Sequence, residues 1–247
     1  MDKSGRVALV TGARQGLGLA FARALAQDGA TVVALDRDDA PEVADELRRL
    51  SGAPALFLRT DVTSPEQVDE AARRIFEKFG KCDIIVNNAG INQQTPFMEM
   101  TLEEWRRIMT VNVDSMFLIC KALVGAMIQN EYGRIVNIAS DTLGHSFPGL
   151  AHYMASKGAV VGLTRGLAND LGPHGITVNC IAPGLTRTPR TQDVPPQVFD
   201  AIMKGQPIKR HSTPEELVGA LSFLTSEAAG FMTGQTLVVN GGYLKAI

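Results

Sequence analysis

Short apolar runs rich in β-branched residues alternate along this chain with longer segments of helical periodicity, which restricts the folds available to it. Seven runs are predicted to be strands: Val7–Val10, Thr31–Leu35, Ala55–Arg59, Ile84–Val86, Arg134–Ile138, Thr177–Ile181 and Thr236–Val239. Six segments are predicted to be helices: Gly16–Asp28, Pro41–Leu50, Pro65–Phe79, Leu102–Asn130, Ala151–Leu171 and Pro214–Thr225. Such alternation predicts right-handed βαβ units, and therefore a parallel sheet with helices on both faces.

No linker, charge block or short repeat divides the 247 residues, so we expect a single α/β domain over residues 1–247. A net charge of −2 provides no broad basic field for nucleic acid or an anionic membrane. The cysteines at 82, 120 and 180 form no disulfide or zinc pattern, so no metal is expected and a reducing cytoplasm fits. The N-terminus has too few apolar residues for a signal peptide.

Several helices carry start signals, and one long segment carries none. Ser64-Pro65 and Thr213-Pro214 each place a hydroxyl cap before a proline, and Thr101 begins a capping box. The segment Gly184–Ser212 is rich in proline and is expected to be irregular. A loop of that length in a compact domain is usually functional, so residues 184–212 are predicted to be a lid over the substrate.

A glycine-rich turn joins the first predicted strand to the first predicted helix. Its pattern, Gly-x3-Gly-x-Gly, differs from the standard dinucleotide fingerprint and alone would also fit an ordinary turn. Its place before a helix favours phosphate binding, because glycines permit close approach and the helix start offers unpaired N–H groups. The residues expected to contact the cofactor there are Gly12, Arg14, Gln15, Gly16, Leu17 and Gly18.

The acidic residue at the end of the second strand bears on the choice of cofactor. Asp36 can accept hydrogen bonds from the adenosine ribose hydroxyls, and it would repel a 2′-phosphate. This favours NAD over NADP. Arg37 and Arg14 are the counter-evidence, because a guanidinium can pair with that phosphate. Asp36 also has the simpler interpretation of a solvated side chain in a polar run.

The ends of the third and fourth strands supply further candidate cofactor contacts. Asp61 could accept from the adenine amino group while Val62 packs on the ring, although an Asp here is also a common way to begin a helix. Asn88 could tie neighbouring loops together, and Gly90 permits close approach to the cofactor. An ordinary loop is the alternative for these two residues.

A candidate acid–base pair follows the fifth strand. Tyr153 and Lys157 are four residues apart, so they share a helix face, and Ser140 precedes them at a strand end. A free tyrosine has a pKa of about 10, and a nearby ammonium would lower it toward neutrality. Ser140 could hold the substrate oxygen as charge develops on it. The sequence therefore predicts hydride transfer between NAD(P) and an alcohol or carbonyl, with Tyr153 as acid–base group.

These motifs together resemble those of the classical short-chain dehydrogenase/reductase family over nearly the whole chain. The resemblance implies a Rossmann-type doubly wound sheet of seven parallel strands in the order 3-2-1-4-5-6-7, and a homotetramer assembled through the segments 102–130 and 151–171. It places Asn112 in a catalytic tetrad with Ser140, Tyr153 and Lys157, at a locally distorted helix. It also implies that Tyr153 and Lys157 contact the cofactor, as do residues that line the nicotinamide: Pro183, Gly184, Thr186 and Thr188.

The substrate is predicted only as a class, a small or medium secondary alcohol, a sugar or a related hydroxy compound. The residues after Gly90 (92–94), residues 141–150 and the predicted lid should form its pocket. One alternative is a 3-oxoacyl-(acyl-carrier-protein) reductase that uses NADPH. The neutral to acidic end of the long helix, at residues 129–131, disfavours it, because such reductases generally meet their acidic carrier there with basic residues. Another alternative is a nucleotide sensor without catalysis on the same fold.

Overall fold

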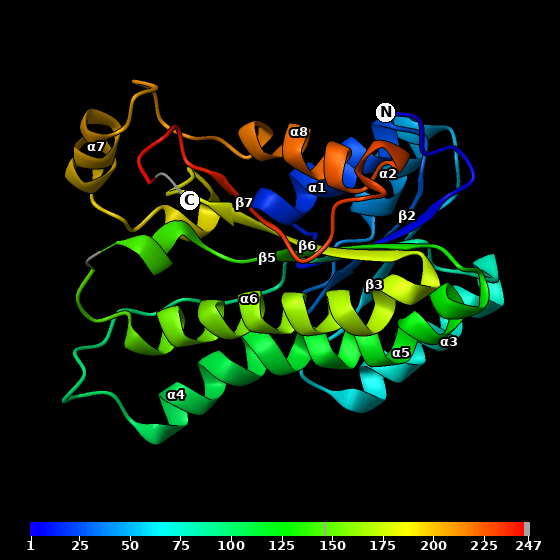
Figure 1. Ribbon diagram of the computed structural model, residues 1–247, viewed down its shortest axis with the longest axis horizontal. Coiled ribbons are helices and arrows are strands. Elements are labelled where there is room, and N and C mark those ends of the chain that lie inside the picture. Colours follow the sequence, from blue (N-terminus) through cyan, green and yellow to red (C-terminus); the bar gives the residue numbers. More distant parts are fainter. Residues whose placement is uncertain (146, 245–247) are drawn as a thin grey trace.

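The computed structural model describes residues 1–145 and 147–244 (Figure 1). At its centre lies a seven-stranded parallel sheet in the order β3-β2-β1-β4-β5-β6-β7, which confirms the predicted fold class and strand order. The strands are β1 (Val7–Thr11), β2 (Thr31–Asp36), β3 (Ala55–Arg59), β4 (Ile84–Asn87), β5 (Gly133–Ile138), β6 (Ile176–Pro183) and β7 (Thr236–Val239).

Helices cover both faces of the sheet, as the alternation predicts. In Figure 1, α1, α2 and α8 lie above it, and α3, α5 and α6 lie below. Because β1, β4 and β5 are apolar on both sides, two separate hydrophobic layers form against these helices. The helices are α1 (Gly16–Gln27), α2 (Glu42–Ser51), α3 (Pro65–Phe79), α4 (Leu102–Met109), α5 (Ser115–Gln129), α6 (Ala151–Leu171), α7 (Pro196–Gly205) and α8 (Glu215–Leu224).

The predicted long helix at 102–130 is interrupted by a π-helix, η1, over Thr110–Asp114. The span Leu102–Gln129 is long and apolar enough, by length and composition, to cross a membrane. Here it lies along the sheet, and α5 packs against α3 and β4. Its apolar positions 116, 119, 123 and 127 are buried in the domain core.

Two of the three predicted caps are present. The Ser64 hydroxyl accepts from the backbone N–H of Gln67 (3.3 Å), and Thr101 forms its capping box with Glu104. The predicted Thr213 cap is wrong. α8 begins at Glu215, and among the described residues no backbone N–H of its first turn bonds the Thr213 hydroxyl.

The segment 184–212 is not irregular throughout, contrary to the prediction. It contains a short 3₁₀ helix at Pro189–Thr191 and the helix α7, which begins at Pro196, where proline is compatible with the first helical turn. The chain near the C-terminus packs on α7: a Cβ added to Gly205 would overlap the Tyr243 ring. Whether this segment acts as a lid remains a prediction.

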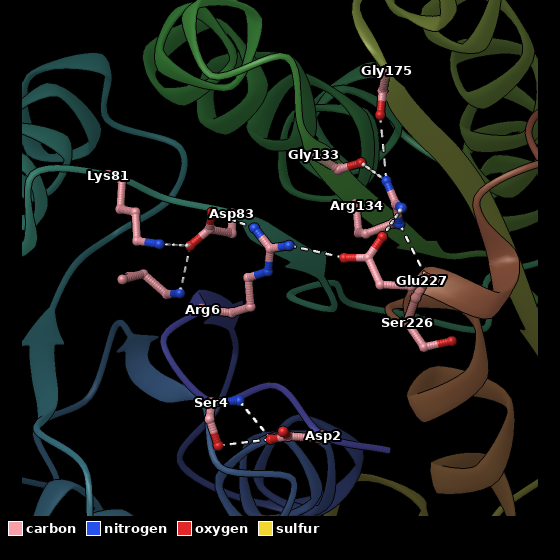
Figure 2. Close-up of polar contacts among 11 residues, drawn as sticks. Asp2, Ser4, Arg6, Lys81, Asp83, Gly133, Arg134, Gly175, Ser226 and Glu227 are labelled. Carbon is pink, nitrogen blue, oxygen red and sulfur yellow. Dashed lines mark hydrogen bonds and ion pairs between the residues drawn. The ribbon is translucent and has the colours of Figure 1, made fainter.

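A polar network joins the amino-terminal ends of β1 and β4 (Figure 2). The buried Asp83 carboxylate accepts from the Val7 backbone N–H (2.8 Å) and lies 3.1 Å from Lys81 Nζ and 3.4 Å from Arg6 Nη1. Arg6 also donates to Glu227 (2.8 Å), which begins a short 3₁₀ helix after α8. The network therefore connects strands at their amino-terminal ends.

The variant Asp83→Asn is expected to lower the free energy of unfolding by about 1–3 kcal/mol, because it removes the charge from a buried acceptor that faces two cations. Urea unfolding followed by circular dichroism measures this. The matched control is Asp45→Asn, which alters an exposed pair with Arg48 (2.8 Å) and should stay within about 0.5 kcal/mol of wild type. Equal effects of the two variants would contradict a special role for the network.

Candidate active site

A cleft of about 500 Å³ opens at the carboxyl ends of the central strands, where parallel α/β sheets bind ligands. The turn between β1 and α1 contributes the predicted residues Gly12, Arg14, Gln15, Gly16, Leu17 and Gly18. The strand ends and the segment after β6 contribute the predicted residues Asp36, Asp61, Val62, Asn88, Gly90 and Thr188. The structure thus gathers most of the predicted cofactor-binding residues around one cavity.

The glycine turn fits a pyrophosphate. Gly12 (φ 64°) and Gly16 (φ 59°) adopt left-handed conformations that favour glycine. A Cβ added to Gly18 would overlap the carbonyl oxygen of Gly12, so this close packing requires glycine. Asn88 Nδ2 donates to the carbonyl oxygens of Thr11 (2.9 Å) and Gly12 (3.1 Å) and holds the turn, as the sequence suggested. The first N–H groups of α1 have no partner within the helix, and the helix begins at this cleft.

The end of the cleft beside β2 and β3 is acidic, and hydrogen bonds fix the positions of its carboxylates. The Asp36 carboxylate accepts from the backbone N–H groups of Arg14 (3.1 Å) and Asp38 (3.2 Å). The Arg14 guanidinium is already paired with Asp38 (3.3 Å). Asp61 accepts from the backbone N–H (2.9 Å) and hydroxyl (2.7 Å) of Thr63, so it also organises the turn before α3.

The predicted reacting groups lie behind Gly90. Lys157 Nζ donates to the carbonyl oxygen of Ile138 (2.7 Å) and sits 5.7 Å from the centre of the Tyr153 ring. A Cβ added to Gly90 would lie 3.7 Å from Lys157 Nζ, which places the lysine directly against the cleft wall. The Ser140 hydroxyl, just beyond β5, accepts from the Thr142 backbone N–H (3.2 Å). Serine, tyrosine and lysine are thereby arranged at the ends of β5 and α6.

The electrostatics of this pair differ from the prediction. Burial raises the pKa of Tyr153 above its usual value of about 10, and the groups that lower it again are the charge of Arg190 and a hydrogen bond with Ser140. Burial also lowers the pKa of Lys157 to about 7, and Arg190 adds to that effect. Arg190 is therefore a cation that favours the tyrosine phenolate, and the same role for Lys157 stays a prediction.

Asn112 lies in the π-helix, which agrees with the locally distorted helix that the resemblance implies. Its buried side chain accepts from the backbone N–H of Ile91 (2.7 Å) and donates to the carbonyl oxygen of Ile91 (2.9 Å) and to Ser156 Oγ (2.9 Å). The amide group therefore connects the loop segment after Gly90 to α6. Its role in the reaction stays a prediction.

Part of the predicted nicotinamide-binding segment does not line the cleft. Pro183 ends β6 and is buried, and a Cβ on Gly184 would lie 2.7 Å from Asn240 Cβ. Thr186 is turned away because its hydroxyl bonds the Gly184 carbonyl oxygen (3.0 Å) and Ser212 (3.1 Å). Tyr153 and Lys157 also lie behind the cleft lining rather than in it.

Sequence reasoning missed several residues that line the cleft, among them Ile91, Arg107, Val111 and Arg190. Arg107 and Val111 are four residues apart where α4 passes into the π-helix, and only the tertiary fold shows which side of that helix faces the cleft. Arg190 follows Pro189 in the segment after β6 and carried no distinguishing pattern. Among the residues that the structure describes, no group of His, Cys, Asp and Glu could hold a metal ion.

Comparison with known proteins fits this geometry. A family model described as enoyl-(acyl carrier protein) reductase matches residues 12–244, a range that holds the glycine turn and the Tyr153–Lys157 pair. The chain belongs to the short-chain dehydrogenase/reductase family. Like other enzymes of this family, it is an oxidoreductase that acts on CH–OH or keto groups with NAD(P).

Two curated relatives of this short-chain dehydrogenase/reductase have different substrates in their names. The 3-oxoacyl-(acyl-carrier-protein) reductase FabG of Vibrio cholerae is 39% identical over 246 residues, which cover 98% of each chain. The gluconate 5-dehydrogenase of Gluconobacter oxydans is 40% identical over 245 residues, which cover 97% of this chain and 94% of the relative. Similarity of sequence therefore leaves the substrate open.

Solved structures agree with the fold and the family. The gluconate 5-dehydrogenase of Burkholderia cenocepacia, in complex with NADP and tartrate, superposes with a TM-score of 0.94 at 37% identity, covering 100% of this chain and 98% of that one. Levodione reductase superposes with a TM-score of 0.91 at 30% identity, covering 97% of both chains.

Proposed function

We propose that this short-chain dehydrogenase/reductase is an NAD-dependent enzyme that interconverts a secondary alcohol and a ketone in a small polyhydroxy compound. The observation that carries the proposal is the position of Lys157 directly behind Gly90 at the wall of the cleft, with its Nζ 5.7 Å from the centre of the Tyr153 ring and Ser140 just beyond β5. The nicotinamide cofactor, when bound, supplies the hydride acceptor or donor. The gluconate 5-dehydrogenases among the relatives support a polyhydroxy substrate.

Each side chain has a role that follows from its position. Tyr153 takes the proton of the alcohol during oxidation and returns it during reduction. Ser140 donates a hydrogen bond that orients the substrate oxygen. Lys157, held by the Ile138 carbonyl oxygen, would bond the nicotinamide ribose, and a water held at the distorted helix around Asn112 would relay the proton outward.

The charge pattern beside β2 supports NAD as the cofactor. Asp36 is fixed by two backbone N–H groups, so it is ready to accept from ribose hydroxyls. Arg14 lies 3.3 Å from Asp38 and 3.9 Å from Asp36, and Arg37 lies 3.8 Å from Asp38, so the two arginines share these two carboxylates. A 2′-phosphate would meet a region with a surplus of negative charge. The NADP bound to the Burkholderia relative is the argument for the alternative.

A second candidate function is 3-oxoacyl-(acyl-carrier-protein) reduction with NADPH, which the FabG relatives support. The surface at the end of α5 favours the polyhydroxy substrate instead. The residues there are Gln129, Asn130 and Glu131, and Glu131 is exposed, so these three residues offer no positive charge to an acidic carrier protein.

The homotetramer and the cytoplasmic location remain proposals. Exposed apolar side chains on the outer side of the long helix support the first, among them Leu102 and Phe117. The three cysteines are buried and free, which is compatible with the second.

Steady-state kinetics with NAD and NADP, over a panel of polyols, hydroxy acids and 3-oxoacyl thioesters, tests the function. We expect turnover of hydroxy compounds with a preference for NAD. The variant Asp36→Ala should lower kcat/KM for NAD and shift the ratio of NAD to NADP efficiency by roughly 10- to 100-fold, because it removes a charged acceptor from the ribose site. The control Asp39→Ala alters an exposed carboxylate outside the cleft lining and should leave the ratio unchanged. A wild type that prefers NADPH and thioesters would establish the second candidate instead.

A further inference from the structure

The two ends of the cleft differ in charge. The lining beside β2 and β3 contains the carboxylates of Asp36, Asp38 and Asp61 together with Arg14 and Arg37. At the other end, near Gly90, the charged residues of the lining are Arg107 and Arg190, and behind the lining lie Lys157 and, close enough to Tyr153 to raise its pKa, the carboxylate of Asp141. An anion entering that end therefore meets a lining whose charged side chains are both positive, while the adenosine end remains acidic.

Arg190 is oriented by one hydrogen bond that leaves its outer edge free. Its Nε donates to Asn92 Oδ1 (3.1 Å). Within residues 1–145 and 147–244, no carboxylate forms an ion pair with Arg190, so Nη1 and Nη2 have no acidic partner in the protein. Two parallel N–H groups of a guanidinium match the two oxygens of a carboxylate.

The position of Arg190 relates it to the reacting groups. Arg190 lines the same cleft as Gly90, behind which Lys157 lies, and its positive charge lowers the pKa of both Tyr153 and Lys157. An anionic group paired with Arg190 would therefore stand close to the tyrosine hydroxyl that exchanges the substrate proton.

Arg107 reinforces the same end of the cleft. Its Nη2 donates to Gln93 Oε1, and Gln93 is in turn held by its bond to Glu104 Oε1 (2.5 Å). Asn92 and Gln93 are consecutive residues shortly after Gly90. One short stretch of chain thus anchors two guanidinium groups, one from α4 and one from the segment after β6.

We propose that Arg190, assisted by Arg107, binds a carboxylate of the substrate, so that the substrate is a hydroxy acid and the product a keto acid. The inference deepens the proposed function and rests on it for the identity of the reacting group. The alcohol carbon would give a hydride to the nicotinamide of the bound cofactor, and its hydroxyl would give a proton to the Tyr153 phenolate, which leaves a ketone. The carboxylate itself is unchanged and serves only to position the molecule.

The cofactor pyrophosphate is the other anion that enters this cleft. It is expected at the start of α1, where N–H groups of the glycine turn are available. If Arg190 served the pyrophosphate instead, its removal would weaken cofactor and substrate binding alike. A measurement of both affinities separates the two assignments.

The experiment compares matched pairs of acid and neutral alcohol: D-gluconate with D-glucitol, L-tartrate with threitol, and 3-hydroxybutyrate with 2-butanol. For the pair that is turned over, wild type should favour the acid in kcat/KM. Arg190→Gln should reduce that preference roughly 10- to 100-fold, mainly through KM, and leave the Kd for NAD within about twofold. Arg190→Lys should retain part of the preference. Profiles are compared over pH, because loss of the Arg190 charge also raises the pKa of Tyr153.

The matched control is Arg187→Gln. Arg187 lies in the same segment, but its guanidinium packs on the Phe199 ring (4.5 Å) and does not line the cleft, so the acid preference should persist. Calorimetric binding of the three acids to the NADH-loaded protein gives a readout without turnover. Binding that depends on Arg190, without any turnover, would refute the proposed function and support the carboxylate site. Two kinetic results would overturn the inference: equal kcat/KM for an acid and its neutral alcohol, or an acid preference that is unchanged in Arg190→Gln. It would also be overturned if Arg190→Gln lost NAD affinity in parallel, or if the protein neither bound nor turned over any of the acids.

Discussion

Tyr153→Phe is expected to lower kcat by about 10²- to 10⁴-fold, the usual contribution of a positioned acid–base group. The phenyl ring keeps the packing of α6, but no hydroxyl remains to exchange a proton with the substrate oxygen. Lys157 retains its bond to Ile138, so the wall behind Gly90 should stay in place. The Kd for NAD, measured by fluorescence titration, should therefore change by less than about twofold.

Tyr132→Phe is the matched control for this substitution. Tyr132 lies at the opposite edge of the sheet, where its ring sits between Arg6 (3.6 Å) and Arg134 (4.4 Å). The ring, not the hydroxyl, makes these contacts, so turnover should stay near wild type. Full activity in Tyr153→Phe would refute the assignment of the acid–base group, and a parallel loss of cofactor affinity would make its role structural.

Gly18→Ala is the second substitution with a large expected effect. Its Cβ would overlap the Gly12 carbonyl oxygen and lie 2.5 Å from Asn88 Nδ2, so the turn must open. Opening misplaces the N–H groups that would face the pyrophosphate. Because charge-assisted hydrogen bonds contribute about 1.5–3 kcal/mol each, loss of two predicts a rise of roughly 100-fold or more in the Kd for NAD. Overpacking should also lower the free energy of unfolding by about 1–3 kcal/mol.

The control for this variant is Gly219→Ala on α8. Gly219 is exposed, and no atom lies within 4 Å of its added Cβ. Alanine there should leave NAD binding unchanged and raise the free energy of unfolding by up to about 1 kcal/mol, through helix propensity alone. Calorimetric titration of NAD and urea unfolding measure both variants. Wild-type NAD affinity in Gly18→Ala would show that the close packing of the turn is dispensable.

The sheet could be predicted well because its strands are buried on both faces and bounded by turns, a local pattern. The family resemblance supplied the strand order. The helix ends were less certain: α8 begins at Glu215 without the predicted Thr213 cap, and α7 was missed because prolines suggested a loop while Pro196 begins a helix. The π-helix followed only from the resemblance, since Asn112 alone indicates no such distortion.

In the site, the sequence correctly predicted which residues of contiguous motifs line the cleft. The glycine turn and Asp36 line the cleft because a strand end and a helix start bring them there directly. Arg107 and Arg190 could not be found in this way, because α4 and the segment after β6 meet only in the folded chain. For the same reason the sequence did not reveal that Arg190 lowers the pKa of Tyr153.

The Asp83 network has a consequence for how substrate choice can change over evolution. It fastens the strands where they begin, at the edge of the sheet away from the cleft, and shares no residue with the cleft lining. Substitutions at Arg190 or Arg107 leave those contacts unchanged, so they should have little effect on the free energy of unfolding of the domain. Substrate specificity can therefore change at the carboxyl ends of the strands while contacts at their amino-terminal ends maintain the fold.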